Sequence, residues 1–180
     1  MLRYKDVRIR KFEERDIPKK VEWINNPENN RYLHYDLPLT IEGTKQWYDR
    51  IKDRTDRFDA VIEYEGIPVG LIGLLGIDRR NMKAEGYWVL GEHNFLRKGI
   101  TTKAHALLSA YTFRDLGLNR LFYYIEVPNV PCVALFRKMG FKEEGILQDD
   151  VKRGDDYYGR YVFAEFAKDF KPDENMYDED

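Results

Sequence analysis

The sequence predicts one α/β domain, of the α+β kind, built on a single mixed sheet. The chain has 180 residues, which is enough for one well-packed domain but too few for two. Hydrophobic residues make up 43% of it and aromatic residues 14%, so it can bury a substantial core. Segments with strand-like alternation and segments with helical spacing follow one another in the order β-α-α-β-β-β-α-β-α-β-β. This order predicts about seven mostly antiparallel strands flanked by about four helices.

The N-terminal part of the chain predicts a strand followed by two helices. Residues 6–12 (DVRIRKF) alternate between apolar and charged side chains, as a half-buried strand does. Asp16 can cap a helix that ends in the polar stretch 25–30 (NNPENN). Thr40 can cap a second helix, because apolar and aromatic side chains recur at helical spacing over residues 44–51.

The middle of the chain predicts three antiparallel strands. Residues 58–64 and 68–77 are rich in β-branched and apolar side chains, and Glu65 and Gly66 between them are typical of a hairpin turn. The second of these strands is apolar on both faces, which indicates a central position in the sheet. Residues 79–90 add a turn and a third strand.

The second half of the chain begins with a helix and a strand that form a crossover unit. Apolar side chains recur at helical spacing over residues 104–111, and Gly117 can end this helix. The strand at 120–127 (RLFYYIEV) can therefore run parallel to the strand before the helix. The remaining predicted elements are a short helix at 128–140 and an antiparallel pair at 141–147 and 156–166.

Charge and cysteine content narrow the class of protein. The formal net charge of −2 argues against a general nucleic-acid binder, which needs a basic face. Cys132 is the single cysteine, so we expect no internal disulfide and no cysteine-based zinc site, and no metal cluster is visible. A charged N-terminus and the lack of an apolar run of roughly 20 residues predict a cytoplasmic protein that does not span a membrane. We expect the domain to cover residues 1–170 and the acidic stretch 171–180 to be a flexible tail.

The loop within residues 91–105 (GEHNFLRKGITTKAH) joins a predicted strand to a predicted helix. Backbone N–H groups at a helix N-terminus, together with the helix dipole, attract anions. Gly99 allows close backbone approach, Arg97 and Lys98 add positive charge, and the two threonines that follow add hydroxyl donors. A phosphate site and an ordinary helix start are both open interpretations. The loop has neither the spacing of a nucleotide P-loop nor that of a dinucleotide-binding turn.

Two segments, in this order, resemble the signature motifs of the GNAT family of acetyltransferases. Residues 84–104 (AEGYWVLGEHNFLRKGITTKA) resemble the central strand and the acetyl-CoA pyrophosphate loop of that family. Residues 129–145 (NVPCVALFRKMGFKEEG) resemble its N-x-x-[SA]-x-x-[LF]-[YF]-x-K-x-G-F-x-x-E-G signature. The branch that looks most similar contains ribosomal-protein and amino-sugar N-acetyltransferases. The resemblance covers residues 5–170, almost the whole chain.

The resemblance implies that acetyl-CoA lies in a cleft where the strands at 79–90 and 120–127 splay apart. A backbone N–H near Val89 or Leu90 would stabilise the oxyanion that forms at the thioester carbonyl. Arg97 stands where the family commonly has glycine, and Phe136 where many members have tyrosine. The implied acetyl-CoA contacts are Val89, Leu90, Arg97, Lys98, Gly99, Ile100, Thr101, Thr102, Asn129 and Phe136.

Three residues are candidates for the acid–base chemistry that such a reaction needs. Glu85 and Glu126 fall on the two strands that flank the implied cleft, and a carboxylate there can take the proton of an attacking amine. A cross-strand salt bridge is an equally simple role for Glu85, and a structural role also stays open for Glu126. Cys132 could protonate the leaving thiolate, but a lone cysteine is often a small core residue, and water could serve as the acid instead.

The polar and aromatic stretch after the first predicted helix is, by the same resemblance, the acceptor-binding region. The candidate residues, which suit a sugar or a small polar amine but would also suit a plain surface loop, are Asn30, Arg31, Tyr32, His34 and Tyr35. We expect an acetyl-CoA-dependent N-acetyltransferase in which a primary amine attacks the thioester directly in a ternary complex. The amine could belong to a protein N-terminus, an amino sugar, a polyamine or an antibiotic. The alternative is a non-catalytic acyl-CoA-binding or regulatory module. A homodimer is possible, and we expect no nucleic-acid or membrane partner.

Overall fold

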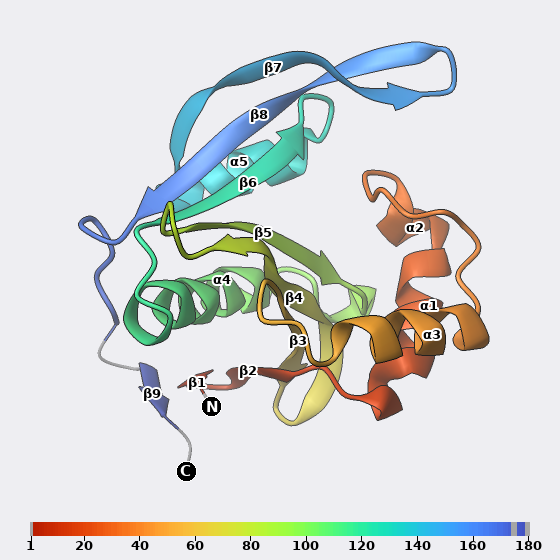
Figure 1. Cartoon of the computed structure of the whole chain (residues 1–180), viewed down its shortest axis with the longest axis horizontal. Helices are drawn as coiled ribbons and strands as arrows, with labels where there is room; N and C mark the ends of the chain where they lie inside the picture. Colours follow the sequence, from red (N-terminus) through yellow and green to blue (C-terminus); the bar gives the residue numbers. More distant parts are fainter. Residues whose placement is uncertain (1, 174–175, 179–180) are drawn as a thin grey trace.

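The computed structural model describes residues 2–173 and 176–178 and shows one open nine-stranded sheet, in the order β7-β8-β6-β5-β4-β3-β2-β1-β9 (Figure 1). Neighbouring strands run antiparallel, except that β5 and β6 are parallel. The strands are β1 (Leu2–Tyr4), β2 (Val7–Lys11), β3 (Phe58–Tyr64), β4 (Ile67–Asp78), β5 (Lys83–Leu90), β6 (Arg120–Glu126), β7 (Lys142–Arg153), β8 (Asp156–Phe166) and β9 (Met176–Asp178).

Helices cover both faces of this sheet. Leu107 and Phe136, from α4 and α5, join the larger core on one face. Trp23 and Ile24, from α1, join a smaller core on the opposite face, against which Trp47 of α3 also packs. No helix of the described residues is long and apolar enough to cross a membrane. The helices are α1 (Ile17–Asn25), α2 (Pro27–Asn30), α3 (Ile41–Ile51), α4 (Ile100–Ala110) and α5 (Val130–Met139).

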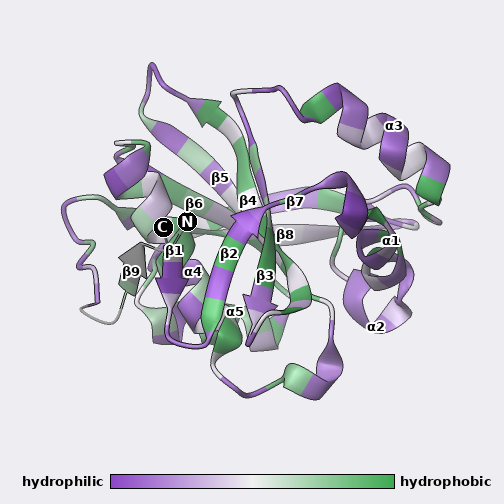
Figure 2. Cartoon of the chain, turned by 90° about the horizontal axis from the view of Figure 1, so that it is seen from below, coloured by the Kyte–Doolittle hydropathy of each residue, from purple (hydrophilic) through white to green (hydrophobic). Residues whose placement is uncertain are grey.

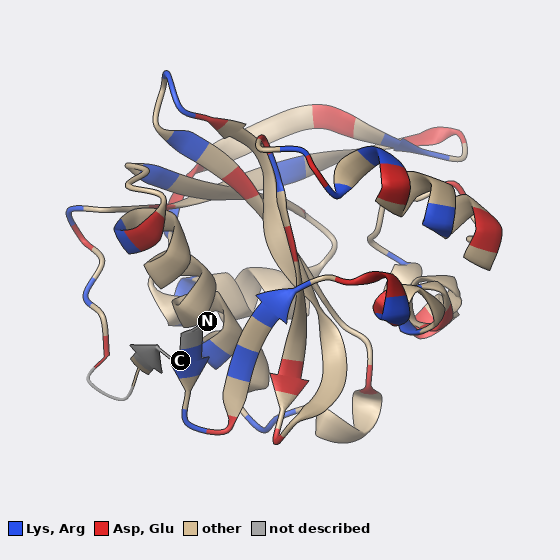
Figure 3. Cartoon of the chain, turned by 60° about the horizontal axis from the view of Figure 1, so that its bottom comes forward, with Lys and Arg blue, Asp and Glu red and all other residues tan. Residues whose placement is uncertain are grey.

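Alternation along the strands divides their side chains between these two cores. In β2, Val7 and Ile9 are buried in the larger core. Arg8 and Arg10 alternate with them and therefore point to the other face of the sheet. Figure 2 shows this as alternating hydrophobic and hydrophilic bands along β2, and Figure 3 shows basic residues in the hydrophilic bands.

The predicted architecture is confirmed, with additions at the ends of the sheet. The predicted strands and the longer helices are present, and β1, α2 and β9 are further short elements. Within the predicted tail, residues 176–178 form β9 and pair with β1, and the flexibility of the tail stays a prediction. The edge of β1 offers unpaired backbone groups, so a short segment can pair with it. Nearby, the Tyr4 hydroxyl donates a hydrogen bond of 2.6 Å to Asp173.

A glycine at the end of β5 brings α1 close to the sheet. A β-carbon built on Gly91 would lie 2.2 Å from Cγ of Trp23, so only glycine fits against this indole ring. The Trp23 ring is buried, and its Nε1–H donates a 3.0 Å hydrogen bond to Glu92. The side-chain amide of Asn29, in α2, donates to the Gly91 carbonyl at 3.2 Å. The segment after α2 is thereby placed beside the end of β5.

Arg10 holds a buried ion cluster that joins α1 to the sheet. Its guanidinium donates two hydrogen bonds of 2.7 Å to Asp16 and one of 2.7 Å to Glu63 on β3. All three residues are buried, with exposed fractions of 4–6%. Asp16 directly precedes α1, and its carboxylate also accepts the backbone N–H of Glu13. The cluster therefore ties the start of α1 to both β2 and β3.

Arg10→Met should lower the free energy of unfolding by about 3–5 kcal/mol, because it leaves the buried carboxylate of Asp16 without its counter-charge and leaves Glu63 paired, among the described residues, with Arg8 alone. Arg15→Met is the matched control. Arg15 pairs with Glu13 at 2.7 Å, but the two side chains are 67% and 51% exposed. Its loss should cost less than about 1 kcal/mol. Urea unfolding followed by circular dichroism measures both values, and equal losses for the two variants would contradict this account of the cluster.

Candidate active site

β5 and β6 begin as paired parallel strands and then separate. Their pairing covers residues 83–85 of β5 and 120–122 of β6. Beyond these residues β5 pairs only with β4, and β6 only with β8, among the strands described. The sheet therefore has a V-shaped notch between the carboxyl ends of β5 and β6 (Figure 1), as the sequence resemblance implied.

Aromatic packing fills the apex of this notch. The Tyr123 ring lies against Gly86, where an added β-carbon would come within 2.3 Å of the ring. Its hydroxyl is hydrogen-bonded to Nδ1 of His105 at 3.0 Å. Burial lowers the pKa of His105 to about 3, so this imidazole is neutral at physiological pH. The Phe136 ring packs on Tyr123 with a centroid distance of 4.8 Å, so the tyrosine is held on several sides.

Main-chain groups of β5 face the notch without a partner strand. Gly91 donates its N–H to Val69 on β4 at 2.8 Å. Successive residues of a strand direct their backbone groups to opposite sides, so Val89 also faces β4, while Trp88 and Leu90 face the notch. Of the two N–H donors implied by the resemblance, Leu90 is therefore the one in position, and Val89 is not.

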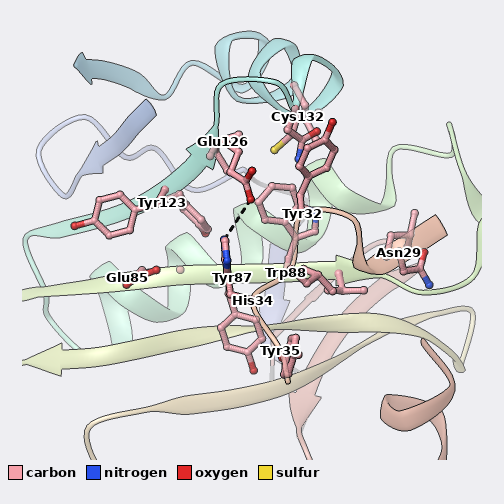
Figure 4. A pocket seen from close by; sticks show the side chains of 18 of the residues that line it. Asn29, Tyr32, His34, Tyr35, Glu85, Tyr87, Trp88, Tyr123, Glu126 and Cys132 are labelled. Carbon is pink, nitrogen blue, oxygen red and sulfur yellow. Dashed lines mark ion pairs between the residues drawn. The ribbon is translucent and has the colours of Figure 1, made fainter. Parts of the chain in front are cut away.

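The notch opens into a cleft of about 810 Å³ that is lined by residues of β5, β4 and α3, among others, and Figure 4 shows side chains around it. Residues far apart in the chain meet there, from helices α2, α3 and α5 and from strands β3, β4, β5, β6 and β8, as is typical of a small-molecule site. The predicted site residues that line the cleft are Tyr32, His34, Tyr35, Glu85, Val89, Leu90, Glu126, Asn129 and Cys132. Those that do not line it are Asn30, Arg31, Phe136 and residues 97–102.

Glu126 is a buried carboxylate at the end of β6. Its Oε1 accepts a 2.5 Å hydrogen bond from Arg153 and lies 3.3 Å from Nε2 of His34 (Figure 4). Its Oε2 is buried and has no hydrogen-bond partner among the residues that the structure describes. An unsatisfied buried acceptor is costly, so this oxygen favours a ligand that brings an N–H group into the cleft.

Glu85 is a half-buried carboxylate at the point where β5 leaves β6. No hydrogen bond or ion pair engages its side chain in the described part of the chain, which disfavours the salt-bridge interpretation. Burial raises the pKa of Glu85, and the positive charge of Arg160 opposes this rise. A cleft carboxylate with a raised pKa and no fixed partner is well suited to accept a proton.

The two α5 positions differ from their expected roles. Cys132 lines the cleft but is only 8% exposed, and burial raises the pKa of its thiol to about 12. Such a thiol gives up its proton reluctantly. Phe136 is fully buried among Trp88, Tyr123 and Phe141, with ring centroids 4.8–5.1 Å away. Phe136 therefore packs in the aromatic core in place of its expected contact with acetyl-CoA.

The predicted acceptor segment crosses from α2 to the end of β6. The Tyr32 hydroxyl donates a 3.1 Å hydrogen bond to the Pro128 carbonyl, and the Arg153 guanidinium lies 5.4 Å from the centroid of the Tyr32 ring. His34 follows and reaches Glu126. Burial lowers the pKa of His34, although the nearby Glu126 carboxylate pulls it upward. Tyr32 and His34 thus form one wall of the cleft beside the notch.

The loop before α4 adopts the left-handed backbone conformation at two residues, Arg97 (φ 64°) and Gly99 (φ 73°). Gly99 directly precedes α4, and the first helical hydrogen bond runs from the Lys103 N–H to its carbonyl at 3.1 Å. The N–H groups of residues 100–102 therefore have no partner within the helix. The Ile100 side chain is buried in the core, so the backbone N–H of Ile100 is the group that this residue can offer to an anion at the N-terminus of α4.

Asn129 completes the donors around the notch from the α5 side. It occupies the N-cap position of α5, yet its side chain makes no capping hydrogen bond. Its amide is thus available to a ligand, as are the backbone groups of Leu90 and the N-terminus of α4. These donors suit a long ligand that carries amide and phosphate groups, so the residues present fit acetyl-CoA.

Sequence reasoning missed the far end of the cleft. Arg57 donates two hydrogen bonds to Asp59, at 2.6 and 2.7 Å, and the Tyr87 hydroxyl donates a third at 2.6 Å. The Tyr87 ring crosses β4 over Gly73, where a β-carbon would lie 2.7 Å from it. Trp47 lines the same end of the cleft. A glycine inside an apolar strand is the sequence signal that indicates such a close approach.

Comparisons with known proteins agree with this geometry. A family model described as an acetyltransferase (GNAT) domain matches residues 6–142. The Bacillus subtilis (strain 168) protein YdaF, named "Putative ribosomal N-acetyltransferase", is 32% identical over 154 residues, covering 81% of this chain and 82% of YdaF. The spermidine N(1)-acetyltransferase of Escherichia coli (strain K12) is 28% identical over 145 residues, covering 80% of this chain and 77% of that protein.

The fold also recurs in a solved structure. The spermidine N-acetyltransferase of Vibrio cholerae in complex with CoA and spermine superposes with a TM-score of 0.84 at 19% identity, over 92% of this chain and 98% of that chain. The family model includes the notch strand β5, the loop before α4 and all of α5. The chain therefore belongs to the GNAT family of acetyl-CoA-dependent N-acetyltransferases.

Proposed function

We propose that this chain acetylates the primary amine of a small molecule, with acetyl-CoA and the amine bound together in the one cleft. The observation that carries the proposal is the meeting of the notch with two cleft carboxylates, Glu85 and Glu126, on the strands beside it. Bound acetyl-CoA supplies a thioester, in which the acyl group is already activated toward a neutral amine. The chain itself has to bind, orient and deprotonate the amine.

The residues around the notch would hold acetyl-CoA along its length. The N–H groups of residues 100–102, with Arg97 and Lys98, are suited to the pyrophosphate. The backbone of Trp88 and the amide of Asn129 flank the notch for the amide-containing arm. The Leu90 N–H is then available to stabilise negative charge that develops on the thioester carbonyl oxygen.

The two carboxylates divide the work on the amine. An amine reaches the cleft as an ammonium ion, which has no lone pair to attack with. The free Oε2 of Glu126 accepts one N–H and orients the group, while Arg153 and His34 keep this carboxylate in place. Glu85 lies four residues back from Glu126 along the paired strands, so the proton that must leave reaches it through water in the cleft. The Cys132 thiol holds its proton tightly, so the CoA thiolate departs without help from Cys132 and takes its proton from the solvent.

The comparisons support a small amine as acceptor. Two of the proteins similar to this chain are named for spermidine, and one solved structure holds spermine with CoA. The non-catalytic alternative has less support, because an unpaired, half-buried Glu85 has no evident structural purpose. The homodimer stays a prediction, to which Ile146 and Leu147 on β7 lend support with exposed fractions of 41% and 38%.

Gly99→Asp should weaken acetyl-CoA binding at least about tenfold, or roughly 1.4 kcal/mol, because it places a negative charge where the pyrophosphate is expected. Gly99→Asn is the matched control: it has nearly the same size and tolerates the left-handed conformation, but it is neutral. Isothermal titration calorimetry with both folded variants measures the difference. If the two variants bind equally well, the pyrophosphate lies elsewhere.

Glu85→Gln should lower kcat for amine acetylation by about 100-fold or more, since an amide cannot accept the proton. In the natural protein the rate should fall as the pH drops through the pKa of Glu85, which burial raises, and the variant should lose this acid limb. Release of free CoA thiol across an amine panel measures both effects. Glu42→Gln, an exposed carboxylate on α3, is the control. Acetyl-CoA binding without thiol release for any amine would favour the non-catalytic alternative.

Cys132→Ala should leave kcat within about twofold of the natural value, because a general acid contributes 10²-fold or more and this thiol is too weak to serve as one. Steady-state thiol release, with acetyl-CoA affinity measured alongside, checks this expectation. A hundredfold fall in kcat with normal folding and normal affinity would instead assign the acid role to Cys132.

A further inference from the structure

Two buried carboxylates of the cleft are each neutralised by an arginine. Asp59 is paired with Arg57, and their side chains are 6% and 17% exposed. Glu126 is paired with Arg153 at 2.5 Å, and its side chain is 2% exposed. Arg160 lines the cleft as well, but it is engaged with Asp150 on β7. These groups therefore present little net charge to a ligand.

Glu85 is the remaining carboxylate inside the cleft, and no ion pair compensates it among the described residues. Glu28 lies at the rim, where its side chain is 73% exposed and lies 2.9 Å from His93. Water screens such an exposed charge strongly. Among the described residues, Glu85 is thus the one interior carboxylate of the cleft that no ion pair engages, and it lies beside the notch.

The far end of the cleft carries the opposite charge. Trp47 and Tyr35 line this end, and the ammonium group of Lys20 lies 4.3 Å and 5.0 Å from their ring centroids. Lys20 is 4% exposed, and within the described chain no carboxylate pairs with it. The Arg57 guanidinium lies 5.3 Å from the centroid of Trp47. Aromatic rings can attract a cationic ligand, but the rings at this end already have the side chains of Lys20 and Arg57 against them.

We propose that the acceptor is a primary amine with a single positive charge. Its amine lies at the unpartnered Oε2 of Glu126, in the field of the Glu85 carboxylate farther along the notch, and its uncharged body extends along the aromatic wall toward Trp47. The inference rests on the proposed function and adds the substrate class. A second ammonium at the far end would meet Lys20 and Arg57, with a neutralised Asp59 as its counter-charge. A polyamine carries several such charges and is disfavoured, unlike in the relatives named for spermidine.

Hexylamine and hexamethylenediamine form a matched pair of acceptors, because they have the same chain length and differ in the second ammonium. With saturating acetyl-CoA and at one fixed pH, kcat/KM for thiol release should be at least about tenfold higher for hexylamine than for the diamine, and higher than for spermidine. A preference for the diamine or for spermidine would overturn the inference while leaving amine acetylation intact. Failure of every amine would instead refute the proposed function, and the inference with it.

Arg57→Gln tests the source of the preference. It leaves the Asp59 charge exposed to a ligand, so the diamine-to-monoamine ratio of kcat/KM should rise at least about tenfold. Arg54→Gln is the charge-matched control: Arg54 bonds Asp56 at 2.7 Å, its side chain is 53% exposed, and it does not line the cleft. In Arg54→Gln the diamine-to-monoamine ratio of kcat/KM should equal that of the natural protein.

Two results would contradict this assignment. An unchanged ratio in folded Arg57→Gln would show that Arg57 does not set the preference. An equal rise in Arg54→Gln would show that overall charge sets it. Circular dichroism establishes whether the variants fold. If Arg57→Gln does not fold, the diamine-to-monoamine ratio of kcat/KM in the natural protein decides whether the inference holds.

Discussion

The short parallel pairing of β5 with β6 is the constraint on which the rest of the site depends. Three residue pairs join the strands, and the Tyr123 ring packs over Gly86 at the point where this pairing ends. Had the strands stayed paired, the backbone groups of Trp88 and Leu90 would form hydrogen bonds with β6 and would not be available to a ligand. Because the strands are parallel, the connection through α4 also brings a helix N-terminus to the end of the sheet where the notch opens.

The long elements of the fold could be predicted because each one buries a face. Alternation in β2 and helical spacing in α4 reflect the side chains that the two cores require. The short strands β1 and β9 could not be predicted in this way. Each has three residues, too few to show a period, and their pairing joins Leu2 to Asp178 across the whole chain. Such contacts depend on an available sheet edge and leave no local signal.

Local motifs predicted the helix that begins after Gly99 and a place near the cleft for Asn129, while their contacts with acetyl-CoA stay predictions. Glu85 and Glu126 could be proposed because their strands flank the notch. The far end of the cleft was not predictable, since the Tyr87–Asp59 contact joins two strands across a third that lies between them. Phe136 shows a related limit: a motif aligns its position in the chain, but the packing of neighbouring rings decides where its side chain lies.

The placement of the tryptophans gives the cleft two natural optical probes. Of the three in the chain, Trp88 lines the cleft at the notch and Trp47 lines it at the far end. Trp23, in α1, is buried against the sheet and does not line the cleft. Indole fluorescence responds to nearby charges and to exclusion of water. Occupancy of the two halves of the cleft can thus be followed separately in single Trp→Phe variants, in real time and without an attached dye, so the order in which two ligands arrive becomes measurable.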